Sequence, residues 1–197
     1  MPSRPSRRRI EEEDRRQLKQ QADFRLAADY VATALAAFEE VCAIALIGSV
    51  ARPLQREVPR FQPFRRHGIE ILHECKDVDL AVWLDRLDRL QALSRARAAA
   101  SNRLLAERSI GVAHHQVELF IFEPNTDAYL GRLCTFGQCP KGHPDCAAPG
   151  CGREPFLKQI EGFQLFADAL SAERTVRLYD RKTGVTVKAA EIAEAPR

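Results

Sequence analysis

The sequence predicts a mixed α/β (α+β) fold in which helices flank a small mixed sheet. Three short apolar runs have the length of buried strands: Ala43–Ile47, Asp77–Trp83 and Gln116–Phe122. Two long stretches without Gly or Pro, residues 10–40 and 85–108, are rich in Ala, Leu and Arg and indicate helices. The chain has 197 residues, of which 45% are hydrophobic, which is enough for one well-buried domain and a small appendage.

The first predicted element is one long amphipathic helix over about residues 10–40, with a break near Asp23 left open. Its apolar side chains recur at helical spacing, at Leu18, Ala22, Leu26, Tyr30, Ala34 and Phe38. We expect this helix to cover one face of the sheet and to lead into the first strand. Residues 1–14 are expected to form a flexible basic tail, in which Arg7–Arg9 are more readily solvated than bound to RNA or phosphate.

Charge and hydropathy limit the partners that the chain is expected to have. The net charge of +3 and the pI near 8.6 permit an anionic substrate but do not indicate a nucleic-acid surface. No apolar core follows the basic N-terminus, so the sequence predicts neither a secretory signal nor a transmembrane span. We therefore expect a cytoplasmic protein without a membrane partner.

Acidic side chains mark the second and third predicted strands. Asp77 and Asp79 stand two residues apart, so they share one face of a strand, with alpha carbons about 7 Å apart. Carboxylates this close repel each other unless a cation neutralises them, and hard oxygen ligands suit Mg²⁺ bound together with substrate phosphates. Glu118 is the single charge in the third strand and is the candidate for a third metal ligand. The alternative places Glu118 on an exposed edge.

The order of these features resembles a known fold. Gly48-Ser49 at the end of the first strand, then Asp77-x-Asp79, then Glu118, is similar to the nucleotidyltransferase fold of the DNA polymerase β superfamily, and closest to its minimal members. The resemblance covers roughly residues 15–123. It implies that Gly48 and Ser49 hold a triphosphate, that Asp77 and Asp79 bind two Mg²⁺ ions, and that Glu118 binds metal or takes the acceptor proton.

Three features depart from the pattern of that family. The interval between Ser49 and Asp77 is longer, Lys76 stands where a small hydroxyl residue is common, and the third acid is Glu rather than Asp. All three departures are compatible with the fold. They affect the expected activity more than the fold.

The residues after Ser49 are expected to start a short helix. The free N–H groups of Val50-Ala51-Arg52 would face an anion there, with Arg52 as a nucleotide ligand or a solvated side chain. The following insertion, residues 53–75, contains three Pro residues and several Arg. Such a long segment inside a compact domain is either a binding segment for a triphosphate or acidic acceptor, or a surface excursion held by Phe61 and Phe64.

The second predicted helix, over Asp85–Arg108, crosses from the second strand to the third, and the nucleotidyltransferase core extends to residue 130. Gly111 is expected to end this helix. Six isolated His and Cys side chains near these elements are expected to be structural or exposed rather than ligands: Cys42, His67, His73, Cys75, His114 and His115.

Four cysteines follow the core, in the pattern Cys134-x4-Cys139-x6-Cys146-x4-Cys151. The surrounding residues 131–155 are rich in Gly and Pro and have few apolar side chains, so they cannot order themselves by hydrophobic burial. Four thiolates that bind one structural Zn²⁺ ion would order such a zinc knuckle, and His143 is a reserve ligand. The alternative is free or redox-active thiols. Residues 156–197 are expected to pack back on the core, with a last strand over Thr175–Asp180.

Two functions from different classes are compatible with this pattern. The first is Mg²⁺-dependent transfer of a nucleoside monophosphate from an NTP to an acceptor hydroxyl on a small molecule, a protein side chain or an RNA end. The second is a module that has the same fold without turnover and binds RNA or a protein partner.

Overall fold

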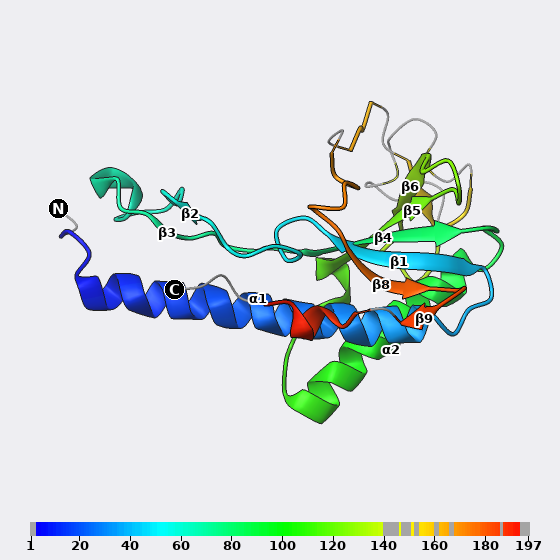
Figure 1. The fold of residues 1–197 in the computed structure, drawn as a ribbon, viewed down its shortest axis with the longest axis horizontal. Helices are drawn as coiled ribbons and strands as arrows, with labels where there is room; N and C mark the ends of the chain where they lie inside the picture. The colour runs from blue at the N-terminus through cyan, green and yellow to red at the C-terminus, as the bar shows by residue number, and fades with distance from the viewer. Residues whose placement is uncertain are drawn as a thin grey trace.

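The structure is a computed structural model, and it describes residues 3–139, 146, 151, 154–159, 162–165, 168–185 and 187–193. Within these residues the chain has a mixed α+β fold with two α-helices and a seven-stranded sheet of order β7-β6-β5-β4-β1-β8-β9 (Figure 1). The strands are β1 Val41–Ile47, β4 Val78–Leu84, β5 Val117–Phe122, β6 Tyr129–Leu133, β7 Leu157–Lys158, β8 Val176–Asp180 and β9 Gly184–Val185. Neighbouring strands are antiparallel except β4 and β5, which are parallel and joined by a helical crossover.

The helix α1, Arg7–Leu35, is longer at its N-terminus and shorter at its C-terminus than the sequence predicted. The Ser6 side chain caps it by accepting a hydrogen bond from the backbone N–H of Arg9 at 3.3 Å. Ion pairs of 2.8 Å join Arg7 to Glu11 and Arg8 to Glu12, one helical turn apart. The prediction of a flexible tail over residues 1–14 is therefore wrong from Arg7 onward. The break that was left open near Asp23 does not occur.

Both helices pack on the same face of the sheet. The crossover helix α2, Leu90–Arg108, ends at Ser109, which adopts a left-handed conformation, two residues before the predicted end at Gly111. Side chains of α1, α2, β1, β4 and β5 fill the main core, among them Leu35, Leu104 and Leu80. The opposite face of the sheet carries a smaller apolar cluster that includes Trp83 and Phe120, and Leu165 and Leu170 of the C-terminal segment cover part of it. The helices thus flank the sheet from one side, and none of those described is long and apolar enough to cross a membrane.

The insertion forms an arm together with the N-terminal half of α1. We use the name arm for residues 3–20 and 53–76. Within it, β2 Arg56–Glu57 and β3 Ile71–Leu72 make an antiparallel ribbon, and the short 3-10 helix η1, Arg65–His67, lies between them. Figure 1 shows this ribbon running along α1 away from the main sheet. The carboxylate of Asp14 accepts hydrogen bonds from Leu72 N at 2.8 Å and from Arg56 at 2.6 Å, which attaches the ribbon to the helix.

The segments on both sides of the cysteines belong to the main sheet. Strand β6 continues to Leu133, so the predicted boundary between the core and the zinc knuckle at residue 130 cuts through a strand and is misplaced. Leu157 of β7 pairs with Leu133, and β8 pairs with β1. The prediction that a strand over Thr175–Asp180 packs back on the sheet is confirmed. Two further 3-10 helices are η2 His114–Gln116 and η4 Ala189–Glu191.

Candidate active site

The edge of the sheet where β1 ends and β4 and β5 begin carries the predicted acidic residues. Asp79 is in register with Ile47 of β1 on one side and with Glu118 of β5 on the other. Val78 and Leu80 face the helices, so Asp79 points to the opposite face, as the alternation of a strand requires. Asp77, two residues earlier, precedes β4 directly. The structure therefore brings Asp77, Asp79 and Glu118 to one corner of the sheet.

Gly48 closes β1 directly against the carboxylate of Asp79. Its φ angle of +75° lies in the left-handed region, and a Cβ atom at this position would stand 2.6 Å from Oδ2 of Asp79. Real Cβ atoms do not approach other atoms this closely, so a side chain would displace either the turn or the carboxylate. The Gly-Ser pair thus has a specific steric role next to the acidic pair.

The turn after Ser49 is held by α1 and does not start a helix. Buried Gln21 donates hydrogen bonds to the carbonyls of Ser49 at 3.2 Å and Arg52 at 2.6 Å, and buried Arg25 donates to the carbonyl of Val50 at 3.1 Å. These carbonyls point toward α1, and Arg52 N bonds back to Ser49 O at 3.5 Å. The prediction of a helix over Val50-Ala51-Arg52 is therefore wrong.

Desolvation and neighbouring negative charge make the ionised forms of exposed Asp77 and half-buried Asp79 unfavourable. Desolvation, and then the charges of Glu118 and Asp77, raise the pKa of Asp79 from 3.8 to about 6. Burial and Glu118 also raise the pKa of Asp77. In the part of the chain that the structure describes, no hydrogen bond reaches either carboxylate. Because an unfolded Asp ionises near 4, Asp79 lowers the stability of the metal-free protein as the pH rises from about 4 through about 6. A bound cation would offset this cost.

Glu118 has a partner that sequence reasoning missed. Its carboxylate accepts a hydrogen bond from Nη1 of Arg132 on β6 at 2.5 Å, and both side chains are about three quarters buried. Glu118 is therefore not on an exposed edge, and its carboxylate forms an ion pair with Arg132. Across the described residues, no group of three or more His, Cys, Asp or Glu side chains is placed to hold a metal ion. The metal candidates that remain without a cationic partner are Asp77 and Asp79.

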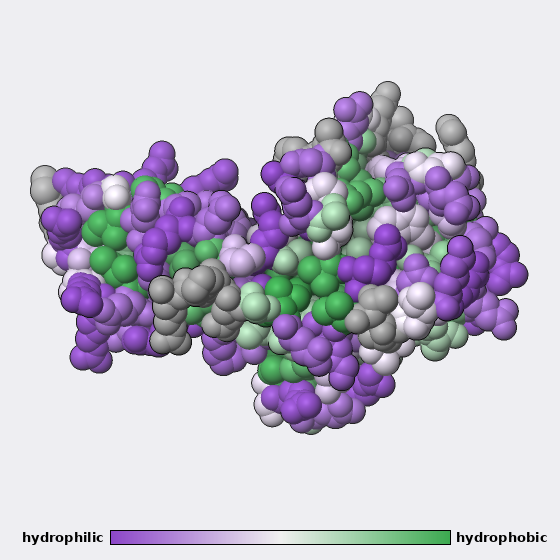
Figure 2. All heavy atoms as spheres, in the orientation of Figure 1, coloured by the Kyte–Doolittle hydropathy of each residue, from purple (hydrophilic) through white to green (hydrophobic). Residues whose placement is uncertain are grey.

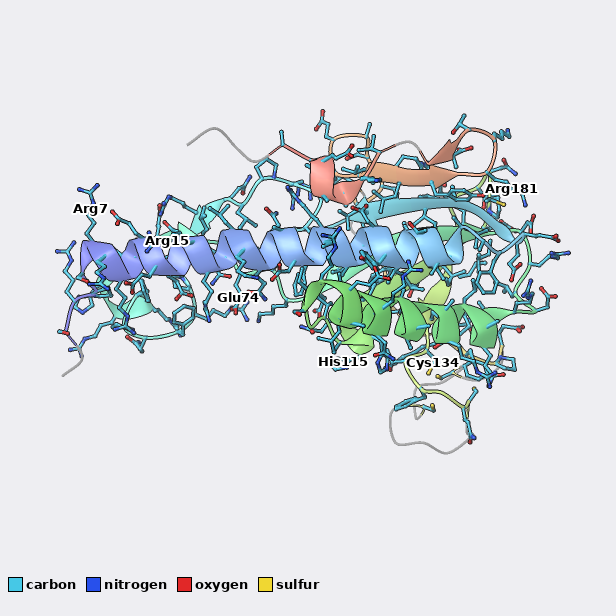
Figure 3. All side chains as sticks on the ribbon, turned by 90° about the horizontal axis from the view of Figure 1, so that it is seen from below. Arg7, Arg15, Glu74, His115, Cys134 and Arg181 are labelled. Atoms are coloured by element: carbon cyan, nitrogen blue, oxygen red, sulfur yellow. The ribbon has the colours of Figure 1, made fainter. Side chains whose placement is uncertain are left out.

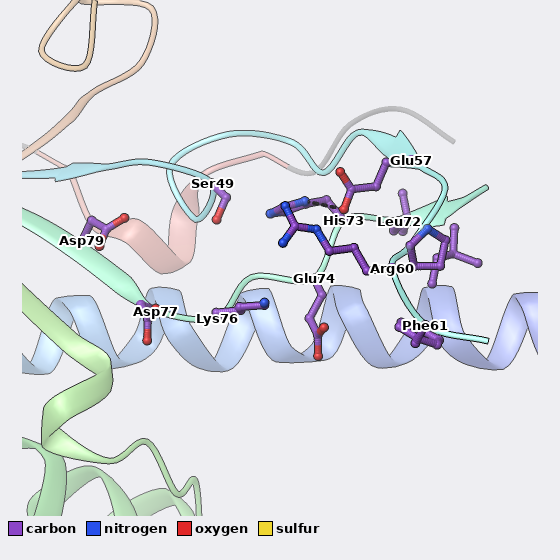
Figure 4. Close-up of a pocket in the computed structure, with 12 residues that line it drawn as sticks. Ser49, Glu57, Arg60, Phe61, Leu72, His73, Glu74, Lys76, Asp77 and Asp79 are labelled. Atoms are coloured by element: carbon purple, nitrogen blue, oxygen red, sulfur yellow. Dashed lines mark hydrogen bonds and ion pairs between the residues drawn. The ribbon is translucent and has the colours of Figure 1, made fainter. Parts of the chain in front are cut away.

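Two cavities meet at Ser49 and Asp79. The first, of about 570 Å³, runs from Asp77 and Asp79 along the arm to Arg60 and Phe61. Figure 4 shows Lys76 and Arg60 extending toward its middle from opposite ends, with Ser49 and the two aspartates at one end. Figure 2 shows the hollow between the arm and the main body. The second cavity, of about 430 Å³, shares Ser49 and Asp79 with the first and extends toward Phe120 and the C-terminal segment.

The four cysteines of the predicted knuckle interact electrostatically, but within the described residues the structure does not place them as a group that could hold a metal ion. Desolvation, and then the neighbouring thiols of Cys151, Cys134 and Cys139, raise the pKa of the Cys146 thiol. All four are free thiols. Cys134 lies beside α2 (Figure 3), and its carbonyl accepts hydrogen bonds from Ser94 and Arg97, each at 3.1 Å. The reserve ligand His143 lies outside the described residues.

Comparisons of the chain with protein-family models, with curated proteins and with solved structures found no match. The functional interpretation therefore depends on the chemistry and geometry of these residues.

We predict that Gly48→Ala destabilises the protein more than Gly68→Ala and also removes its stabilisation by Mg²⁺. Both glycines have positive φ, so each substitution costs roughly 1–2 kcal/mol of backbone strain. Only at Gly48 does the new Cβ meet the carboxylate of Asp79, whereas nothing lies within 4 Å of a Cβ at Gly68. Urea unfolding of both variants, with and without Mg²⁺, measures the two effects. Equal losses in the two variants would contradict the steric role of Gly48.

Proposed function

We propose that this protein is a Mg²⁺-dependent nucleotidyltransferase with a nucleotidyltransferase-like core. The observation that supports this most directly is the acidic pair at one end of a cavity that also contains Lys76 and Arg60: Asp77 is exposed, Asp79 is half-buried, and both carboxyl groups have raised pKa values. Carboxylates without a cationic partner suit divalent metal, and Lys and Arg side chains suit the phosphates that the metal would accompany. Because one cavity contains both acidic and basic side chains, it suits the complex Mg·NTP better than it suits a metal ion alone or an anion alone.

Each residue of the site has a role in this reaction. Asp77 and Asp79 would hold two Mg²⁺ ions, which supply charge neutralisation and a Lewis acid at the phosphates. Ser49, Lys76 and Arg60 bind phosphate oxygens, and Gly48 allows the turn to approach them. Arg52 is a further nucleotide ligand at the wall of the second cavity. The acceptor hydroxyl oxygen forms a bond to the α-phosphorus, the bond to pyrophosphate breaks, and Glu118 receives the hydroxyl proton.

A second candidate function is binding of RNA or a protein partner without turnover. The pairing of Glu118 with Arg132 favours it, because it occupies the third acid. The charge distribution also favours an anionic partner, since the arm carries twelve Arg and Lys against seven Asp and Glu, whereas the rest of the chain carries eighteen against twenty. The acceptor of the transferred nucleotide and the partner of a binding module are therefore both expected to be negatively charged. A cytoplasmic location stays a prediction for both functions.

We also propose one structural Zn²⁺ ion, bound by Cys134, Cys139, Cys146 and Cys151. The spacing of the four cysteines along the chain supports it, together with the electrostatic influence of Cys151, Cys134 and Cys139, which disfavours ionisation of the metal-free Cys146 thiol. A cation would convert this repulsion into four favourable bonds. A closed site with four thiolates has no open position for chemistry, so its role is to order the segment between β6 and β7.

We predict that Asp77→Asn and Asp79→Asn each abolish Mg²⁺-dependent pyrophosphate release from NTPs, assayed with cell extract as the source of acceptor. Neither variant should unfold more easily than wild type at pH 7, because each removes a negative charge that the neighbouring acidic side chains disfavour. Asp85→Asn is the matched control, since Asp85 follows the other end of the same strand and pairs with Arg181. Pyrophosphate release that is unchanged in both site variants would refute the metal assignment, and no release from the wild type with any NTP would favour the binding module.

We predict that Glu118→Gln retains Mg²⁺ and NTP binding but lowers the single-turnover transfer rate by roughly 10²–10⁴, the usual contribution of a positioned base. Glu118→Asp should also lose rate, because about 1 Å of misplacement is costly. Arg132→Gln removes only the partner of the carboxylate, so it should retain more of the rate than Glu118→Gln. Identical losses in Glu118→Gln and Arg132→Gln would indicate that only the ion pair matters.

We predict one Zn²⁺ per chain in protein purified under reducing conditions, measured by elemental analysis. Cys139→Ser should lose most of the zinc and should increase proteolysis between β6 and β7, because ligation and local folding share one free energy. Cys42→Ser is the control, since this free thiol lies on β1 and should leave the zinc content unchanged. Only trace zinc in the wild-type protein would leave free thiols as the correct description.

A further inference from the structure

The second cavity has a different chemical character from the first. Its walls include Ile47, Phe120, Leu165 and Ala169, whereas the first cavity contains most of the charged groups of the site. The two cavities share Ser49 and Asp79, so a ligand that fills both must pass the acidic pair. A volume of about 430 Å³ is in the range of pockets that take a small organic molecule.

An aromatic side chain at the wall of this cavity remains partly uncovered. Phe163 is 38% exposed, although it belongs to the C-terminal segment that covers the sheet. It stacks on Phe120 with a centroid distance of 6.3 Å and an interplanar angle of 19°, and its centroid is 5.3 Å from that of Tyr129. These rings fix the orientation of Phe163. A flat, supported and partly exposed ring at a cavity wall is suited to stack with another planar ring.

Polar groups stand beside this ring and near the shared wall. Gln164 lines the cavity next to Phe163, and its amide can both donate and accept hydrogen bonds. Arg174 also lines it and is held by Asp168 at 2.8 Å. Arg52 lies close to Ser49, and its Nε atom is buried without a hydrogen-bond partner among the described residues. Arg52 thus adds a cationic side chain to the wall that both Ser49 and Asp79 share.

We infer that the second cavity binds the nucleoside of the NTP, with its base stacked against Phe163. This inference rests on the proposed function. A nucleoside triphosphate has a fixed order, in which the α-phosphate lies between the two outer phosphates and the ribose with its base. With the outer phosphates at Lys76 and Arg60 in the first cavity, the α-phosphate reaches Ser49 and Asp79. The nucleoside then continues into the adjoining cavity, where the apolar and aromatic walls are.

The test compares two probes that share the triphosphate but differ in the nucleoside. Binding of Mg·ATP and of Mg·tripolyphosphate is measured by titration calorimetry for the wild type, Phe163→Ala, Phe163→Leu and Phe61→Ala. Stacking of a base on an aromatic side chain is worth about 1–3 kcal/mol, so Phe163→Ala should weaken Mg·ATP binding by roughly 5- to 150-fold. It should leave Mg·tripolyphosphate binding within about twofold of the wild type. Phe163→Leu keeps an apolar side chain at this position and should show the same selective loss, which separates stacking from folding.

The other outcomes separate this inference from the function on which it rests. If the wild type binds neither probe, the proposed nucleotide site fails, and the subsite fails with it. If the wild type binds both probes and Phe163→Ala binds them as tightly, the site for phosphates stands and the nucleoside subsite is refuted. If Phe61→Ala selectively weakens Mg·ATP instead, the base lies at the far end of the first cavity, which also overturns the inference.

Discussion

The burial of Asp79 is the constraint on which the rest of the site depends. Its carboxylate lies against the turn at Gly48 and one strand away from Glu118, and these surroundings raise its pKa to about 6. The negative charge of Asp79 does not stabilise the fold, because desolvation, Glu118 and Asp77 all disfavour it. Only Arg132 favours it. Strained electrostatics of this kind cluster at functional sites, where a ligand supplies the missing charge. The raised pKa of Asp79 is thus the reason for proposing a cation at this pair.

The helix α1 couples this acidic corner to the arm. Its middle residues Gln21 and Arg25 are 2% and 4% exposed and bind the carbonyls of the turn after Ser49, while Asp14, nearer its N-terminus, holds the ribbon. A buried polar side chain that loses its hydrogen-bond partner destabilises the fold, so these bonds hold the turn in place. The turn and the ribbon are both attached to the single helix α1. This explains how an insertion of unusual length can form a wall of the first cavity. It also explains why the turn needs no helix of its own.

Sequence reasoning succeeded where the alternation of side chains along a single strand determines which face of the sheet a residue lies on. The run Asp77–Trp83 predicted the face on which Asp79 lies because the period of a strand is two, and the isolated charge in Gln116–Phe122 predicted Glu118 beside it. It failed where the decisive contact comes from a distant element. Nothing local in Val50-Ala51-Arg52 shows that Gln21 and Arg25 take their carbonyls, and nothing near Glu118 shows that Arg132 is its partner. No strand was predicted over Tyr129–Leu133, because the core was expected to end at residue 130. The alternation of β6, which places Arg132 on the face of Glu118, was therefore not used.

Arg97 links the cysteine segment to the same corner of the sheet. It is fully buried on α2, and desolvation lowers its pKa to about 10. It donates hydrogen bonds to the carbonyl of Cys134 and to the carbonyl of Val117, which directly precedes Glu118. The buried guanidinium of Arg97 costs less free energy when negative charge lies close by. In the proposed zinc site, the cysteine thiolates would supply that negative charge. Loss of that ion would leave Arg97 less compensated and loosen its hold on the start of β5. The cysteine segment is thus linked through Arg97 to the strand that carries Glu118.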